Sequence, residues 1–242
     1  MSTAPRPAFY ALARGGWRDY VTLLHPPYTL WHLSYVALGA GLAPTFDTGR
    51  FLLTLAAFAL AMGLGAHALD ELNGRPLATE IPSGVLIAIA VVSVGAAVAI
   101  GLQVALTFDL RLLFFIAFGA FIVVAYNLEL FGGRLHGDVW FALAWGAFPV
   151  VTAFFAVSGR LELEAVLGGL AAAALSLAQR RLSTQVRLVR RRVASVSGTI
   201  VRKDGRSEPI VAETLLAPPE AALRLMTLAA VALGAALVAL RV

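Results

Sequence analysis

Residues 65–76 read Gly-Ala-His-Ala-Leu-Asp-Glu-Leu-Asn-Gly-Arg-Pro, and they end an apolar run that begins at Phe51. Three ionisable residues lie near the end of this run, namely His67, Asp70 and Glu71. Their spacings of three and four residues put both carboxylates on the helix face of His67. An ionised group beside hydrocarbon is costly, so in a membrane segment it lines a polar cavity or binds something. The stretch predicts a membrane-embedded helix with an acidic site at one end.

The composition indicates an integral membrane protein. The chain has 242 residues, of which 60% are hydrophobic and 14% charged, with a mean hydropathy of +0.83. Soluble domains have about 25% charged residues. The absence of cysteine excludes disulfides and cysteine-ligated metals. We expect one transmembrane domain over residues 1–242, in which residues 1–24 form a cytoplasmic or interfacial N-terminal segment.

Seven stretches have the length and apolar character of membrane-spanning helices. They are residues 28–44, 51–70, 84–107, 112–131, 139–158, 162–179 and 221–240. The fold class that follows is an all-α bundle of about seven transmembrane helices around a central cavity open to the cytoplasmic face. Pro149 should kink or locally open the fifth helix.

The distribution of basic residues predicts the orientation. With the N-terminus inside, the connecting segments on the inner side carry most of the arginines, including the group from Arg180 to Arg206. We therefore expect a cytoplasmic N-terminus and an outer C-terminus in the inner membrane of a prokaryotic cell. The positive charge lies beside apolar spans, so we expect anionic membrane lipids as partners and no nucleic acid.

Two polar segments flank the spans. Residues 8–22 are aromatic and basic, as in an interfacial helix, although a frayed tail is equally consistent with them. Residues 180–219 form a cytoplasmic basic loop, which starts as a basic helix over 179–192. The turn Lys203-Asp204-Gly205 between short β-branched runs predicts a hairpin within it.

The ionisable residues allow a functional and a structural interpretation. Asp70 and Glu71 could ligate a metal with His67, or they could be solvated charges that end a helix. Arg75, Arg134, Arg180 and Arg181 could contact a diphosphate. The arginines at 190–192 are more typical of contacts with anionic lipid. Asp138 could equally cap a helix, and Tyr126 and Asn127 could be polar groups of the cavity.

Three stretches resemble the UbiA-type intramembrane prenyltransferase superfamily. The first is His25-Pro26-Pro27-Tyr28-Thr29-Leu30-Trp31, at the start of the first span. The second comprises the acidic cluster, Arg75-Pro76-Leu77 and Ile81-Pro82-Ser83-Gly84, similar to an "RPLPSG" segment of the family. The third comprises Ala125-Tyr126-Asn127, Gly137-Asp138 and Trp145-Gly146-Ala147-Phe148-Pro149-Val150. The likeness covers residues 22–180.

The resemblance implies a transfer reaction within the membrane. Such enzymes move a prenyl group from a prenyl diphosphate to a lipophilic, often aromatic, acceptor, and Mg²⁺ bridges acidic motifs to the diphosphate. By this resemblance Asp70 and Glu71 are the catalytic residues, and His67 joins them as a metal ligand. Arg75, Arg134, Arg180 and Arg181 would bind the diphosphate.

The chain departs from the family at both acidic motifs. At the positions of the first motif, Asn-Asp-x-x-Asp-x-x-x-Asp, only Asp70 matches. Where the second motif belongs the chain has Arg180 and Arg181 and no carboxylate. A non-catalytic binder of polyprenyl lipid is therefore the alternative hypothesis. A retinal protein is excluded because the one lysine, Lys203, lies in the polar loop.

Overall fold

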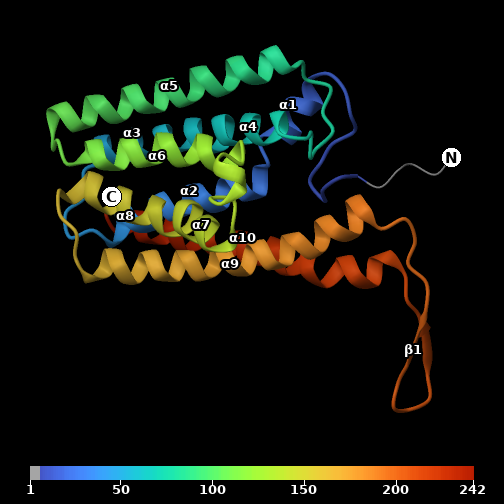
Figure 1. Cartoon of the computed structure of the whole chain (residues 1–242). Coiled ribbons are helices and arrows are strands. Elements are labelled where there is room, and N and C mark those ends of the chain that lie inside the picture. The colour runs from blue at the N-terminus through green and yellow to red at the C-terminus, as the bar shows by residue number, and fades with distance from the viewer. Residues whose placement is uncertain (1–5) are drawn as a thin grey trace.

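The computed structural model describes residues 6–242, most of which form antiparallel helices (Figure 1). The α-helices are α1 (Trp17–Leu23), α2 (Pro26–Leu42), α3 (Thr48–Phe58), α4 (His67–Leu72), α5 (Ser83–Thr107), α6 (Leu112–Asn127), α7 (Asp138–Phe141), α8 (Phe148–Ser158), α9 (Leu163–Arg192) and α10 (Ala212–Ala239). A short 3₁₀ turn, η2 (Phe131–Gly133), lies between α6 and α7. The prediction of an all-α class is confirmed.

Two of the long helical rods contain a π-helical segment. The first rod joins α3 to α4 through η1 (Ala59–Ala66), and the second joins α7 to α8 through η3 (Ala142–Ala147). π-Helical segments are rare in proteins, and those that occur are often found at functional sites. In the first rod the segment ends directly before His67, so it influences the direction of the acidic face of α4.

Within residues 6–242, four helical rods are long and apolar enough to cross a membrane. They are Thr48–Leu72, Ser83–Thr107, Asp138–Ser158 and Ala212–Ala239. Helix α6 is apolar but shorter. Large apolar side chains of the outer helices are exposed, for example Val92 on α5 and Leu225 on α10, as expected of a lipid-facing surface. The arrangement of seven spans stays a prediction.

Helices α2, α8 and α10 pack closely because glycines let their backbones approach. A Cβ atom added at Gly39 on α2 would lie 2.1 Å from the carbonyl oxygen of Val150 on α8. At Gly41 on α2 it would lie 2.6 Å from Cβ of Leu237 on α10. These distances allow no side chain, so the positions are fixed by packing. Figure 1 shows α5 along one edge of the bundle and α9 with α10 along the other.

Pro149 has the predicted local effect on the fifth helix. A proline has no N–H, so it leaves the carbonyl of the residue four positions earlier without its helical donor. That residue is Trp145, and its oxygen accepts a hydrogen bond from Nδ1 of the buried His32 at 2.8 Å. The opened turn of the second rod is thereby tied to α2.

The N-terminal segment differs from the prediction of an interfacial helix over 8–22. Only α1 is helical, and residues 6–16 run along the end of the bundle without regular structure. Gly15 and Gly16 have positive φ values of 102° and 62°, which interrupt a helix at this point. Ala8 and Ala11 are nevertheless buried, so this segment packs against the helices.

The basic segment 180–219 is more helical than predicted. Helix α9 continues to Arg192 and α10 begins at Ala212, so only residues 193–211 connect them. Within this connection β1 (Thr199–Val201) and β2 (Ser207–Pro209) pair as an antiparallel hairpin. The hairpin projects beyond the end of the bundle, at the opposite end from the C-terminus (Figure 1).

Candidate functional site

Glu71 binds the loop that follows α4. Its side chain is fully buried, and its carboxylate accepts hydrogen bonds from the backbone N–H of Leu77 at 2.9 Å and of Thr79 at 2.8 Å. The hydroxyl of Thr79 donates a third bond at 2.9 Å. Because both oxygens point into the loop, the geometry gives Glu71 a structural role and not the catalytic, metal-ligating one that the sequence suggested.

Asp70 is different from its neighbour. It is half-buried, and its carboxylate makes no hydrogen bond or ion pair with any residue in 6–242. It lies within electrostatic range of His136, Arg187 and Arg191. Of the acidic cluster predicted from the sequence, Asp70 alone has a carboxylate that is free for a ligand.

His67 is fixed by its own helix and by a second histidine. Its Nδ1 lies 3.1 Å from the carbonyl oxygen of Gly63, one turn earlier. Its ring stacks on that of His25, with centroids 4.2 Å apart and planes 14° apart. His25 immediately precedes α2, so the stack joins the beginning of the first long helix to the acidic face of α4.

Tyr10 connects the N-terminal segment to this stack. Its hydroxyl oxygen lies 2.8 Å from Nδ1 of His25. Burial raises the pKa of Tyr10 well above its usual value, and the nearby Tyr28 adds to this effect. Burial also lowers the pKa of His25 well below its usual value, and His67 adds to that shift. Tyr10 is therefore a neutral phenol and His25 a neutral imidazole at pH 7.

Arg187 and Arg191 bring positive charge to the same place. Both act electrostatically on Tyr10 and on His25. Burial lowers the pKa of Arg191 and the charge of Arg187 adds to this, whereas Tyr10 and Asp70 oppose it. The C-terminal half of α9 thus supplies two guanidinium groups near the free carboxylate. The sequence analysis selected neither of them, because it assigned the arginines at 190–192 to lipid contacts and gave Arg187 no role of its own.

Arg180 lies at the centre of a separate network. Its Nε donates to Asp138 at 2.7 Å, and its Nη2 donates to the carbonyl oxygen of His136 at 3.3 Å. Its Nη1 donates to the hydroxyl of Tyr126, and its guanidinium lies over the ring of Phe141. This network ties α9 to α6, α7 and the connection between them, so Arg180 has few donors left for a diphosphate.

The other residues predicted for the site are dispersed. Arg75 donates to the carbonyl oxygen of Ile81 at 2.6 Å and to Ser83 at 2.8 Å, which binds it to its own loop. Arg134 is exposed, and exposed Arg181 pairs with Asp138 at 3.3 Å. The side-chain amide of the buried Asn127 donates to its own helix at 2.6 Å.

Arg190 does not have the lipid-binding role that the sequence suggested. Its Nε lies 2.5 Å from Oε1 of Glu220 on α10, and the two side chains are only 15% and 8% exposed. This ion pair joins α9 to α10 just after Pro218 and Pro219. Arg190 is therefore a structural residue.

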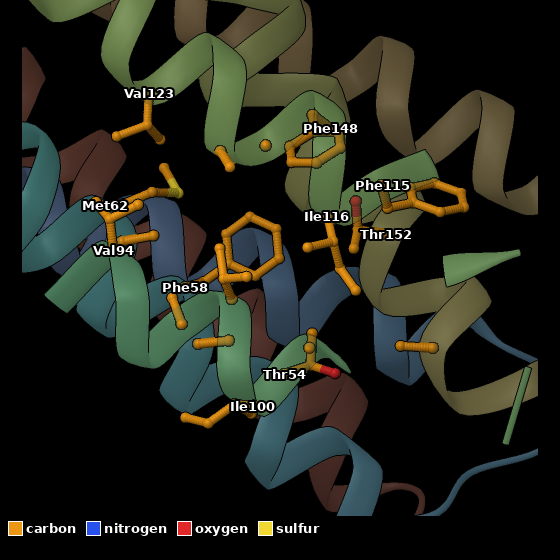
Figure 2. A pocket seen from close by; sticks show the side chains of 18 of the residues that line it. Thr54, Phe58, Met62, Val94, Ile100, Phe115, Ile116, Val123, Phe148 and Thr152 are labelled. Carbon is orange, nitrogen blue, oxygen red and sulfur yellow. The ribbon is translucent and has the colours of Figure 1, made fainter. Parts of the chain in front are cut away.

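An apolar cavity of about 110 Å³ lies between η1, α3, α5, α6 and α8 (Figure 2). Phe58, Phe115 and Phe148 line it, and Thr54 and Thr152 are among its few polar groups. Met62 and Trp145 also line it. Met62 is little more than one helical turn from His67, so part of the cavity lining and the acidic face lie on the same rod. A central cavity open at the polar end stays a prediction.

The donor set is poor for a resident metal ion. Within residues 6–242 no group of three or more histidine, aspartate or glutamate side chains is placed to hold one. Mg²⁺ prefers oxygen ligands and is often held by one or two carboxylates together with substrate phosphates. Asp70 fits the role of such a single carboxylate. The two-carboxylate arrangement with Glu71 does not fit this geometry.

Backbone strain is concentrated in the segments that border the polar end. Within the described chain the non-glycine residues with positive φ are His25, Arg75, Ala78, Glu129 and Phe131. They lie directly before α2, between α4 and α5, and between α6 and α7. Such conformations cost about 1–3 kcal/mol each and cluster at functional sites. The strain therefore points to the same end of the bundle as the polar residues.

Comparison with protein-family models, with curated proteins and with solved structures found no match to this chain.

Proposed function

We propose that this protein binds a prenyl diphosphate in the membrane and transfers its prenyl group to a lipophilic or aromatic acceptor. The resemblance of three stretches to the UbiA-type prenyltransferases motivates this proposal. The substrate class is an amphiphile with a strongly anionic head and an apolar chain, and the arrangement of the site supports such a ligand.

One observation carries the proposal. The free carboxylate of Asp70 lies within electrostatic range of Arg187 and Arg191, at the end of a rod whose preceding turns line an apolar cavity. Guanidinium groups bind phosphate oxygens with charge-assisted hydrogen bonds. The cavity offers a place for the isoprenoid chain, whose burial is favourable because its surface is apolar.

Mg²⁺ enters the proposal as at most one ion. Asp70 would give it one oxygen ligand, and the remaining ligands would be phosphate oxygens and water. The ion would offset charge on the diphosphate. Arg187 and Arg191 would hold the head group directly, which compensates for the missing second acidic motif.

The experiment is a binding and turnover measurement with purified protein in lipid nanodiscs. Farnesyl diphosphate should bind in the presence of Mg²⁺, and release of diphosphate should follow when an acceptor is added. Asp70→Asn and Arg187→Gln should each weaken binding by about tenfold or more, since each removes a charge-assisted contact.

Asp109→Asn is the matched control. Asp109 is an acidic residue that pairs with Arg111 in the connection between α5 and α6. This variant should bind as the parent does. If farnesyl diphosphate fails to bind the parent, or if all three variants bind equally well, the proposal is wrong.

A non-catalytic lipid-binding role is the second candidate, and the geometry of Glu71 favours it. With this carboxylate bound to Leu77 and Thr79, the site has one free carboxylate instead of several. Such a protein would bind farnesyl diphosphate without releasing diphosphate. The turnover measurement distinguishes it from the enzyme.

A further inference from the structure

The imidazole of His25 has one nitrogen with a partner and one without. Nδ1 is bound to the Tyr10 hydroxyl at 2.8 Å. Nε2 is buried and has no hydrogen-bond partner in residues 6–242. A buried polar atom without a partner is unusual and requires an explanation.

The partner of Nδ1 determines which nitrogen carries the proton. If Tyr10 donates to Nδ1, the hydroxyl proton has an acceptor and His25 carries its own proton on Nε2. If Nδ1 donated instead, the Tyr10 proton would have no recorded acceptor, and Nε2 would still lack a partner. The first arrangement leaves only Nε2–H unpaired, whereas the second leaves both the Tyr10 hydroxyl proton and Nε2 unpaired. His25 is therefore the Nε2–H tautomer, with an unused donor.

The surroundings of this donor favour an anion. His67 stacks on the His25 ring, and the guanidiniums of Arg187 and Arg191 act on it electrostatically. Tyr28 is another neighbour, and its ring centroid lies 6.4 Å from that of His25. An N–H donor with two nearby cations is complementary to a phosphate oxygen.

We infer that His25 is a ligand-binding residue whose Nε2–H donates a hydrogen bond to a phosphate oxygen, and that Tyr10 is the positioning residue that fixes this tautomer. This inference rests on the proposed function, because it assigns a further contact to the same anionic head group. It gives the N-terminal segment a role in the site, since Tyr10 lies outside every helix.

The backbone at His25 supports this role. His25 has φ 44° and ψ 56°, a left-handed conformation that is uncommon for a residue other than glycine. It also precedes Pro26, which restricts its backbone further. A strained residue that holds its ring against His67 is consistent with a fixed ligand-binding geometry. Because Nε2 is covered, a ligand reaches it only if a neighbouring group other than Tyr10 moves.

The test is nitrogen NMR on protein labelled with ¹⁵N-histidine in nanodiscs of zwitterionic lipid. The chain has four histidines, so each signal can be assigned by one substitution. In the parent, the His25 signals should report Nε2 protonation, and addition of farnesyl diphosphate should shift its Nε2 signal. His32 serves as the internal control, because its Nδ1 is bound to Trp145 within the bundle.

Variants test the contact and its positioning separately. His25→Phe keeps a ring for the stack and His25→Asn suits the left-handed backbone. Both remove the Nε2–H donor and should weaken binding of farnesyl diphosphate by about tenfold, the usual effect of losing a bond to a charged group. Tyr10→Phe should give a mixture of His25 tautomers. Asp109→Asn, the control in the connection between α5 and α6, should leave the affinity unchanged.

The outcomes separate this inference from the proposed function. If farnesyl diphosphate binds, but the His25 signals stay fixed and both His25 variants bind as the parent does, the inference is wrong and a water fills the position. If inorganic pyrophosphate also shifts the Nε2 signal, the head group alone is sufficient and the inference is supported. A response to phosphatidylglycerol nanodiscs but not to farnesyl diphosphate overturns it in favour of a lipid contact. Failure of farnesyl diphosphate to bind the parent overturns both proposals.

Discussion

The carboxylate of Glu71 binds Thr79 twice, through the backbone N–H at 2.8 Å and through the hydroxyl at 2.9 Å. This pair fixes the loop between α4 and α5, and the backbone N–H of Glu80 in the same loop donates to Asp19 on α1 at 2.8 Å. Two buried carboxylates therefore hold the loop from different sides. The adjacent Asp70 has no such partner in the described chain, so one acidic pair contains a structural and a free carboxylate.

This difference predicts that two conservative substitutions affect different properties, one the stability of the protein and the other its ligand binding. Glu71→Gln should lower the free energy of unfolding by about 2 kcal/mol, because it weakens three hydrogen bonds to a buried charged acceptor. Asp70→Asn should have little effect on stability and a large effect on ligand binding. Thermal unfolding in detergent, followed by circular dichroism, measures the first effect. Equal loss of stability in the two variants would contradict the assignment.

The ion pair between Arg190 and Glu220 should contribute more to the free energy of unfolding than surface ion pairs do. Either Arg190→Gln or Glu220→Gln should lower the free energy of unfolding by about 3 kcal/mol, since each leaves a mostly buried charge without its partner. The double variant should be more stable than the sum of the two losses implies. A double-mutant cycle on Arg202 and Glu208, an exposed pair of the hairpin, is the comparison and should give a coupling below about 1 kcal/mol.

Substitution of Arg180 should lower the stability of the protein, whereas substitution of its exposed neighbour Arg181 should not. Arg180→Lys should not restore the parent stability, because an ammonium group lacks the planar fork that reaches Asp138 and Tyr126 together. Arg181→Lys should be neutral, since the side chain of Arg181 is 78% exposed. The melting temperatures of the four proteins with Lys or Gln at these positions measure the contrast. A parent-like Arg180→Lys protein would show that the network needs only charge.

The lowered pKa of His25 predicts a pH dependence of stability. The unfolded chain binds a proton at this histidine near pH 6.5, its usual pKa, whereas the folded protein resists that proton because the ring is buried beside His67, Arg187 and Arg191. The unfolded state therefore binds more protons below pH 6.5, and the stability falls as the pH decreases from 6.5 toward the lower folded pKa. His25→Phe should lose less stability than the parent between pH 7 and pH 5. Parallel curves for the two proteins would contradict the assignment.

The orientation in the membrane can be tested with single cysteines, because the chain has none of its own. A cysteine at Ser207, in the hairpin, should react with an impermeant thiol reagent only after the inner face is opened. A cysteine at Thr48, which is exposed at the start of α3, should react from outside. The reverse pattern would show that the distribution of arginines does not set the orientation.

The sequence by itself determined the all-α class, the position of the long helices and the end of the bundle where polar residues gather. These features depend on the hydrophobicity of continuous segments and on local signals such as Pro149, which acts on the carbonyl of Trp145 four residues away. It also indicated a turn at Lys203-Asp204-Gly205, where the hairpin lies. Properties of this kind are local in the chain and can be predicted without knowing which helices meet.

Only the tertiary structure decided which ionisable side chains are free. Glu71 and Asp70 are neighbours of the same type, yet only the carboxylate of Glu71 meets the backbone N–H groups of the folded loop after α4. Arg190 and Arg191 differ for the same reason, because successive residues point to different sides of a helix and only one of them meets Glu220 on α10. The pairing of Tyr10 with His25 depends on the path of a non-helical segment that has no periodic signal. The function of an ionisable residue is therefore set by its partners, and these are determined by the packing of helices far apart in the sequence.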